Sequence, residues 1–259
     1  MATNDSDKST PSDLAIPVTF MLENKMNRIL WCLAIFLTLT VCIVILQPLH
    51  NKYLCLITLL LFLCLFSVIF VLFKQYKWFK IALPTVALAC LGILLNQSKI
   101  DSKTLSSLYI NQLISFNNVP YVWGGESGFG IDCSGLPRKS LVNALLLYSV
   151  SHFNGTAFLK AIDYWWNDAS ALEMTRGYNG RMTVSDHVFT INESAKLSIS
   201  PGDLAVTENG VHVMVFLDSK HVIQAEPGAG KVIINDVPSA NSWLQQNVKL
   251  VRWSCFDIF

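Results

Sequence analysis

The amino-acid sequence predicts an α+β domain, with helices packed on an antiparallel sheet, preceded by three transmembrane helices. The first observation is a run of three long apolar stretches within about the first hundred residues. The second is the order of patterns in the remaining polar part: helical patterns come first, and short strand-like runs separated by turn residues follow. Helices followed by a run of strands are typical of the α+β class.

Composition supports this division of the chain. Of the 259 residues, 52% are hydrophobic and only 14% are charged, whereas a soluble globular chain has about 25% charged residues. The net charge of +1 implies no strongly acidic or basic partner. The chain has no basic stripe or zinc-finger spacing, so we expect no nucleic-acid partner. It also has no CxxC pair, so we expect no metal site and no disulfide framework.

The first part of the chain is expected to be a tail followed by a membrane anchor. Residues 1–28 begin with a stretch rich in Ser, Thr, Asp and Pro, and we expect a disordered cytoplasmic tail. The anchor, residues 29–98, contains the almost uncharged stretches Ile29–Gln47, Tyr53–Phe73 and Phe79–Leu95. Each is close to the roughly 17–25 residues that cross a bilayer. Buried core helices are the alternative, which three such stretches in succession disfavour.

Basic residues in the short loops predict the orientation of the anchor. Lys25 and Arg28 precede the first span, and Lys74, Lys77 and Lys80 lie around the start of the third. Fewer basic residues flank the opposite ends of the spans, namely Lys52, Lys99 and Lys103. We therefore expect a multi-pass protein of the cytoplasmic (inner) membrane with its N-terminus in the cytoplasm. An odd number of crossings then puts the C-terminal domain on the periplasmic or extracellular side.

The C-terminal domain, residues 99–259, has a normal single-domain size. Apolar periodicity predicts helices over Thr104–Phe116, Ser134–Tyr148 and Ala157–Ala171. Alternating or apolar runs between turn residues predict strands. These runs are Asp203–Thr207, Val211–Leu217, His221–Ala225, Val232–Asn235 and Val248–Trp253.

A glycine-rich segment before the second predicted helix presents the first candidate catalytic residue. Gly124, Gly125 and Gly130 precede the sequence Asp132-Cys133. Asp132 is a candidate N-cap whose carboxylate accepts from first-turn amides. A thiol at a helix N-terminus is close to the positive end of the helix dipole, which favours the thiolate. Cys133 is therefore a candidate nucleophile, and a buried structural cysteine in a turn is the alternative.

A histidine and a glutamine on neighbouring predicted strands complete the candidate set. His212 opens one strand, and Gln224 lies on the next. A strand holds an imidazole rigidly enough to act as the base for a thiol. The side-chain carbonyl of Gln224 would accept from one imidazole nitrogen and fix the tautomer, so that the other nitrogen faces sulfur. A lone strand histidine is more often structural, but the glutamine one hairpin later favours the catalytic interpretation.

These residues resemble the NlpC-type cell-wall peptidase family. The matching segments are Tyr121–Gly125, Asp132–Gly135, Pro201–Leu204, His212–Val213 and Ile223–Ala225. The resemblance implies a papain-like α+β domain with Cys133 as nucleophile, His212 as base and Gln224 as the orienting residue. It further implies that Tyr121 lines the cleft or supports the oxyanion. Asp132 and Ser134 match positions that bind the free amino end of the substrate in some members.

The sequence departs from the family pattern in two places. Pro137 lies in the first turns of the cysteine helix, where it removes a backbone donor. The stretch between Cys133 and His212 is long and includes the aromatic segment Tyr164-Trp165-Trp166. This insertion either shapes a substrate cleft or packs over the core, and aromatic residues favour the core.

The resemblance implies a membrane-anchored cysteine peptidase or amidase that hydrolyses peptidoglycan stem peptides. The expected partners are this peptide substrate and the lipid bilayer; no metal or organic cofactor is expected, and the oligomeric state is left open. A thiol-dependent acyltransferase, thioesterase or amidase acting on another substrate is an alternative, because the same Cys–His pair serves these reactions. A third hypothesis is a non-catalytic domain that binds the cell wall or a partner.

Overall fold

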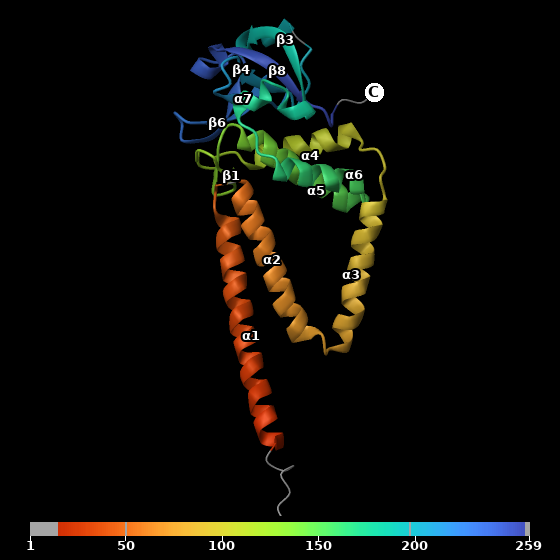
Figure 1. Cartoon of the computed structure of the whole chain (residues 1–259). Helices are drawn as coiled ribbons and strands as arrows, with labels where there is room; N and C mark the ends of the chain where they lie inside the picture. The colour runs from red at the N-terminus through yellow and green to blue at the C-terminus, as the bar shows by residue number, and fades with distance from the viewer. Residues whose placement is uncertain (1–14, 50, 197, 257–259) are drawn as a thin grey trace, which may run out of the picture. The chain divides into compact units, whose positions relative to one another are not determined.

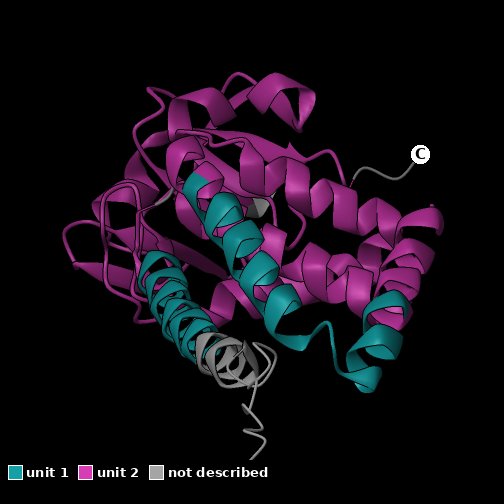
Figure 2. Ribbon diagram, turned by 60° about the horizontal axis from the view of Figure 1, so that its bottom comes forward, with its two compact units in different colours: residues 1–45, 57–84 teal, residues 46–56, 85–259 magenta. Residues whose placement is uncertain are grey.

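The computed structural model describes residues 15–49, 51–196 and 198–256. The chain forms two compact units, shown in different colours in Figure 2. One unit comprises residues 1–45 and 57–84, and the other comprises residues 46–56 and 85–259.

Three long helices contain the apolar stretches. They are α1 (Ala15–Leu46), α2 (Lys52–Phe73) and α3 (Lys77–Leu95). Each is long and apolar enough to cross a membrane, with the first candidate span covering Lys25–Leu46. Helix α1 begins at Ala15, so residues 15–28 of the expected disordered tail are helical, and residues 1–14 lie outside the described part of the chain.

Helices and a six-stranded sheet make up the second unit after α3. The helices are α4 (Ser102–Ser115), α5 (Gly135–His152), α6 (Gly155–Trp166) and the short α7 (Ala171–Met174). The short strands β1 (Glu126–Ser127) and β2 (Gly130–Ile131) form a hairpin before α5. Three 3₁₀ helices complete the connections: η1 (Tyr178–Gly180), η2 (Ile191–Lys196) and η3 (Ser242–Gln245).

The large sheet is antiparallel throughout and has the strand order β3-β8-β4-β5-β6-β7. Its strands are β3 (Met182–Thr190), β4 (Leu204–Thr207), β5 (Val213–Phe216), β6 (His221–Glu226), β7 (Lys231–Asp236) and β8 (Asn247–Trp253). Helices α4, α5 and α6 lie together on one side of it (Figure 1). This arrangement confirms the predicted α+β class with helices packed on an antiparallel sheet.

The sheet separates two apolar clusters. Side chains such as Val213 and Val215 pack with the helices, whereas Met214 and Phe216 pack with residues around η3 on the other side. Successive side chains of a strand point to opposite faces, and every residue of β4 and β5 is buried. The central strands are therefore covered on both faces, which explains why they are short apolar runs.

The predicted elements agree with the structure apart from the end of the third helix, and strands β1, β2 and β3 are additional to them. The helix predicted over Ala157–Ala171 ends at Trp166, and α7 follows separately. Strand β3 was not predicted, because its centre is the polar run Ser185-Asp186-His187 and a register shift interrupts its pairing with β8. Pro137 is the third residue of α5, where the missing amide has no partner inside the helix in any case.

Candidate active site

Cys133 lies between the β1–β2 hairpin and the start of α5. The backbone there is packed too closely for side chains at two glycines. A Cβ on Gly125 would meet the carbonyl oxygen of Gly130 at 2.6 Å, and a Cβ on Gly135 would meet the carbonyl oxygen of Gly125 at 2.4 Å. Glycine at these positions therefore allows the loop to fold against the helix start and to fix the position of Cys133.

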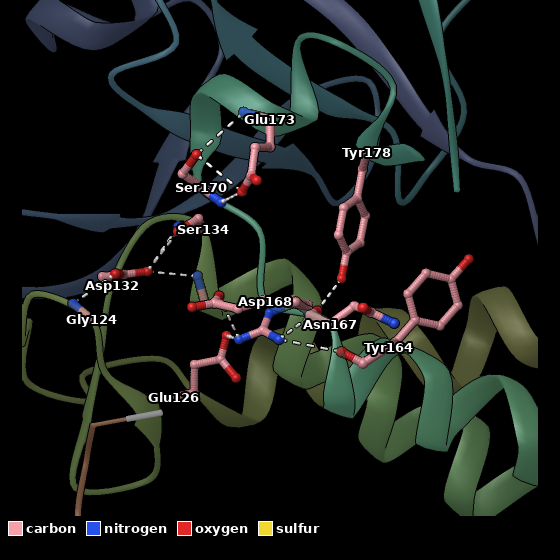
Figure 3. A network of polar contacts seen from close by, with 12 residues as sticks. Gly124, Glu126, Asp132, Ser134, Tyr164, Asn167, Asp168, Ser170, Glu173 and Tyr178 are labelled. Carbon is pink, nitrogen blue, oxygen red and sulfur yellow. Dashed lines mark hydrogen bonds and ion pairs between the residues drawn. The ribbon is translucent and has the colours of Figure 1, made fainter. Parts of the chain in front are cut away.

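The carboxylate of Asp132 binds both the helix start and the preceding loop (Figure 3). Its Oδ1 accepts from the amides of Ser134 at 3.0 Å and Gly135 at 2.6 Å. Its Oδ2 accepts from the amide of Gly124 at 2.8 Å. Asp132 therefore makes the expected contacts with first-turn amides, although the N-cap position itself is Ser134. The positive end of the helix thus faces this carboxylate.

The thiol of Cys133 is buried, and its pKa is raised to about 12. Burial is the main cause, followed by the negative charge of Asp132; backbone amides of Val213 and Ser134 act in the opposite direction. The helix dipole was expected to favour the thiolate. That expectation does not describe the resting site, because desolvation disfavours the charged sulfur and Asp132 already occupies the first-turn amides.

His212 is held by Gln224 in the interior. Nε2 of the imidazole lies 2.6 Å from Oε1 of Gln224, and the Nε2 amide group of Gln224 donates to Oδ1 of Asn235 at 2.8 Å. Burial lowers the pKa of His212 to about 4, and the hydrogen bond that His212 donates to Oε1 of Gln224 partly opposes this shift. No hydrogen bond of the described residues involves Nδ1 of His212. The imidazole is therefore a neutral ring held through its Nε2 atom.

Trp243 on η3 packs against the same imidazole. The two ring centroids are 4.2 Å apart, and the ring planes differ by 26°. The backbone amide of His212 also donates to Oγ1 of Thr207 at 2.9 Å. The sequence analysis identified neither Trp243, which reaches the site from the distant η3, nor Asn235, which lies on the strand paired with that of Gln224. No local signal identifies them.

The sulfur lies beside the backbone that bears His212. Sγ of Cys133 is 3.9 Å from the carbonyl oxygen of Val211, which it contacts as a donor, and it is close to the amide of Val213. Within the described parts of the chain, no hydrogen bond joins Sγ to the imidazole. The structure thus brings the thiol to the backbone segment of His212, which lies directly before β5 and not in the strand as predicted, and joins His212 directly to Gln224.

A pocket of about 480 Å³ opens in front of Cys133. Its wall includes the other three predicted site residues, Tyr121, Asp132 and Ser134, together with Val211 and residues 168–172. His212 and Gln224 do not line the pocket and are buried, with exposed fractions of 1% and 0%. Burial, followed by the neighbouring Cys133 and Asp132, raises the pKa of Tyr121 to about 12. Its hydroxyl therefore stays protonated and is able to donate.

A charged cluster that sequence reasoning missed forms another part of the pocket wall (Figure 3). Arg138 is 1% exposed, forms an ion pair with Glu126 and lies 3.0 Å from Oδ1 of Asp168. Its Nη1 also donates to the carbonyl oxygens of Tyr164 at 3.2 Å and Asn167 at 2.9 Å. Burial raises the pKa of Glu126 to about 7, and Arg138 opposes the shift. The sequence signal for this cluster is the pair of neighbouring basic residues Arg138 and Lys139 near the start of α5.

The insertion between Cys133 and His212 serves both roles that the sequence allowed. Tyr164 is buried and packs edge-on against Trp253, with ring centroids 5.3 Å apart. The residues that reach the pocket come just afterwards, where α7 begins with a capping box formed by Ser170 and Glu173 (Figure 3). The aromatic segment therefore supports the core, and the turn that follows it forms the cleft wall.

The fold defines the class of protein: a papain-like α+β domain in which a cysteine precedes a helix that packs on an antiparallel sheet. The NlpC/P60 family matches residues 118–252, more than half of the chain. The chain belongs to the NlpC/P60 family. Members of this family are typically cysteine peptidases or amidases, which supports a cell-wall peptidase. A comparison with curated proteins gave no match.

Three solved structures are similar to the chain at low identity. The P60 domain of an antigen from M. avium subspecies paratuberculosis is 20% identical, with 61% of this chain and 100% of that chain covered and a TM-score of 0.38. The peptidoglycan hydrolase RipB from Mycobacterium tuberculosis is 19% identical, with coverages of 69% and 90% and a TM-score of 0.39. NlpC2 from Trichomonas vaginalis is 17% identical, with coverages of 60% and 48% and a TM-score of 0.38.

Proposed function

We propose that the protein is a membrane-anchored cysteine peptidase that hydrolyses peptide bonds in peptidoglycan stem peptides. Cys133 is the nucleophile, His212 the base and Gln224 the residue that orients the base. The observation that supports this assignment best is the buried 2.6 Å contact between His212 and Gln224, with Cys133 in a pocket wall and its sulfur 3.9 Å from the carbonyl oxygen of the neighbouring Val211.

The hydrogen bonds that join His212, Gln224 and Asn235 favour the imidazole tautomer that can accept a proton from the thiol. Because the amide group of Gln224 donates to Asn235, its carbonyl oxygen faces the ring and accepts from Nε2–H. Nδ1 then carries the lone pair. In the reaction, the thiol proton moves to Nδ1 of His212 while Sγ of Cys133 bonds to the scissile carbonyl carbon. A raised thiol pKa and a lowered imidazole pKa keep both groups neutral until substrate arrives.

Collapse of the tetrahedral intermediate completes the first half of the reaction. The imidazolium gives its proton to the leaving amine, the carbon–nitrogen bond breaks, and an acyl-enzyme remains on sulfur. Water activated by His212 then attacks the thioester, releases the carboxylic acid and restores the thiol. Tyr121 stands in the pocket wall with a protonated hydroxyl, which we assign to stabilising the developing oxyanion.

The pocket wall also suits a substrate with a free amino end. Asp132 and Ser134 lie on either side of Cys133 in the wall, and Oγ of Ser134 donates to Oδ1 of Asp132 at 3.0 Å. The hydroxyl oxygen of Ser134 therefore keeps its lone pairs for an ammonium group. Asp132 adds negative charge at the same place, and Asp168, which is paired with Arg138, also lines the pocket. We assign Asp132 and Ser134 to binding the amino end of the stem peptide.

Three transmembrane helices would hold this domain at the membrane. We place the anchor at residues 29–98 and the peptidase domain at residues 99–259, because α3 ends at Leu95 and α4 begins at Ser102. The basic residues of the loops place the tail, residues 1–28, in the cytoplasm and the peptidase domain on the periplasmic or extracellular side. Such an enzyme would cut only wall material close to the membrane.

The test is product analysis with the full chain in lipid nanodiscs and purified muropeptides. We expect new amine ends with the native chain, none with Cys133→Ala, and native amounts with the matched control Cys255→Ala. Cys255 is also a partly buried cysteine, but it lies outside the pocket wall. Identical product profiles for the native chain and Cys133→Ala would contradict the peptidase assignment. A thiol-dependent conjugate in place of hydrolysis would indicate an acyltransferase.

A further inference from the structure

Helices α5 and α6 expose large apolar side chains on the side that does not face the core. The exposed fractions are 66% for Val150, 63% for Phe153, 50% for Leu159, 49% for Leu147, 43% for Ile162 and 37% for Trp166. We call these six residues the α5–α6 apolar face. Other residues of the same helices, such as Tyr148 and Ala161, are buried in the helix-side core. The two helices are therefore apolar on both sides, which is unusual for a helix layer at a water-exposed surface.

The turn between α5 and α6 is bound to the end of a membrane span. The carbonyl oxygen of Asn96, next to the end of α3, accepts from the amide of Gly155 at 2.8 Å. The side-chain amide of Asn96 donates to the carbonyl oxygen of Phe153 at 2.8 Å. A Cβ on Gly155 would lie 2.5 Å from the carbonyl oxygen of Ile93, inside α3. The α5–α6 turn is therefore packed against the last turn of an apolar span.

The other end of α5 is close to a second span boundary. The loop between α1 and α2 contacts the loop before Cys133: the carbonyl oxygen of Pro48 accepts from the amide of Glu126 at 2.6 Å, and Leu49 forms a bridge with Gly125. Gly135, the first residue of α5, packs directly against Gly125. Both ends of α5 are thus held at points where the chain leaves or enters an apolar helix.

We propose that the α5–α6 apolar face lies in the interfacial region of the lipid bilayer. This inference rests on the proposed membrane anchor. Two contacts at span ends hold α5 at the boundary between membrane and water, where an apolar helix face enters the headgroup and acyl-chain boundary. Trp166 is of a residue type enriched at this depth. We favour lipid over a second copy of the chain as the partner of this face. The ends of the membrane spans lie beside the face, so lipid is present there whether or not a second copy binds.

The charged residues near the face are compatible with lipid. Asp163 on α6 is paired with Arg181 through two contacts of 2.7 Å. Lys160 is partly exposed on the same helix, and a lysine places its ammonium group in the headgroup region while its stem contacts apolar chains. An embedded face would hold the pocket at a fixed height above the membrane, so substrates would have to approach along the membrane surface.

Photocrosslinking to lipid tests the proposal with the full chain in liposomes. The photoreactive residue p-benzoylphenylalanine replaces Val150 or Ile162 in the face, Leu60 in α2 as a span reference, or Ile234 on β7 as a control. Ile234 is also an exposed apolar residue, with 38% of its surface accessible, but it lies on the edge strand of the sheet. We expect lipid adducts at positions 150 and 162 in yields close to that at 60, and at least about tenfold above that at 234.

Three outcomes would overturn the inference. Yields at positions 150 and 162 as low as at 234, with lipid adducts at 60, would show that the anchor is correct but the face is not embedded. Adducts joining two copies of the chain at 150 or 162 would identify a protein interface instead. An absence of lipid adducts at position 60 as well would overturn both the proposed membrane anchor and the proposed contact of the α5–α6 apolar face with lipid. Unchanged muropeptide activity of each variant confirms that it is folded.

Discussion

The side-chain carbonyl of Gln224 lies 2.6 Å from Nε2 of His212, and both residues are almost completely buried. A contact this short between neutral groups fixes the direction of the ring and the position of its proton. Asn235 accepts from the other end of the Gln224 amide, so the glutamine cannot flip without losing a second hydrogen bond. The catalytic assignment depends most on this pair, and it gives the first prediction.

Removing the side chain of Gln224 is expected to impair turnover more than substrate binding. In Gln224→Ala, His212 loses the acceptor of its Nε2 proton, which corresponds to about 1–2 kcal/mol, or roughly a five- to thirtyfold decrease in kcat. KM should change little, because Gln224 does not line the pocket. Gln224→His should restore much of the activity. The control is Gln245→Ala, at an exposed glutamine on η3, and an equal decrease in both variants would contradict the orienting role.

The pH dependence of thiol labelling is the second prediction. Burial raises the pKa of Cys133 to about 12 and lowers that of His212 to about 4, so the resting pair is neutral between these values. Alkylation of Cys133 by iodoacetamide should therefore be slow near pH 6 and rise continuously towards alkaline pH. The comparison of native chain and Cys133→Ala by mass spectrometry isolates this residue. A labelling maximum near pH 6 would instead indicate a thiolate–imidazolium pair.

The structure predicts a neutral resting thiol at Cys133, whereas the sequence alone predicts that the helix dipole favours the thiolate. A cysteine at a helix start is visible in the sequence, and so is the favourable dipole. The burial of Cys133 and the occupation of the first-turn amides by Asp132 are properties of the folded chain. The sequence did predict the helices and central strands, because their apolar patterns are local. It could not predict Trp243 or β3, whose positions depend on long-range packing.

Trp243 should control the basicity of His212. Replacing it with alanine exposes one face of the imidazole to water, which favours the protonated ring and raises its pKa from about 4 towards the ordinary value of 6.5. The acid limb of kcat/KM should therefore move to higher pH in Trp243→Ala, while Trp243→Phe retains the native limb. Glu226 is the charged group that acts on His212, so Glu226→Gln serves to separate its contribution. An unchanged acid limb in Trp243→Ala would rule out this role.

Breaking the ion pair of Arg138 and Glu126 should lower the free energy of unfolding far more than breaking the pair of Arg181 and Asp163. Arg138→Ala leaves Glu126 buried without its cation, and breaking such a pair costs about 3–5 kcal/mol. The matched control is Arg181→Ala, whose pair with Asp163 is partly exposed and contributes about 0–1 kcal/mol. Thermal unfolding of the full chain in detergent, followed by near-ultraviolet circular dichroism, measures both. Similar losses in the two variants would contradict this account.

Glu126 also makes the free energy of unfolding depend on pH, and its raised pKa determines the direction of this dependence. Its pKa is about 7 in the folded chain and 4.5 for a free side chain, so the folded state holds the proton more tightly. The contribution of this group to stability is therefore largest below pH 4.5 and decreases as pH rises to about 7. Glu126→Gln should remove this part of the slope while leaving the acid-side loss due to His212, whose lowered pKa works in the opposite direction.

Gly135 should be the most sensitive glycine of the cysteine loop. A Cβ at this position would lie 2.4 Å from the carbonyl oxygen of Gly125, so Gly135→Ala must displace either the loop or the start of α5. Because Cys133 lies between these two segments, we expect activity to be lost even where the chain still folds. Gly128→Ala is the control, since no atom lies within 4 Å of its added Cβ. Muropeptide cleavage and Cys133 alkylation are measured together with circular dichroism. Native activity in a folded Gly135→Ala variant would show that the close packing of this loop does not position the thiol.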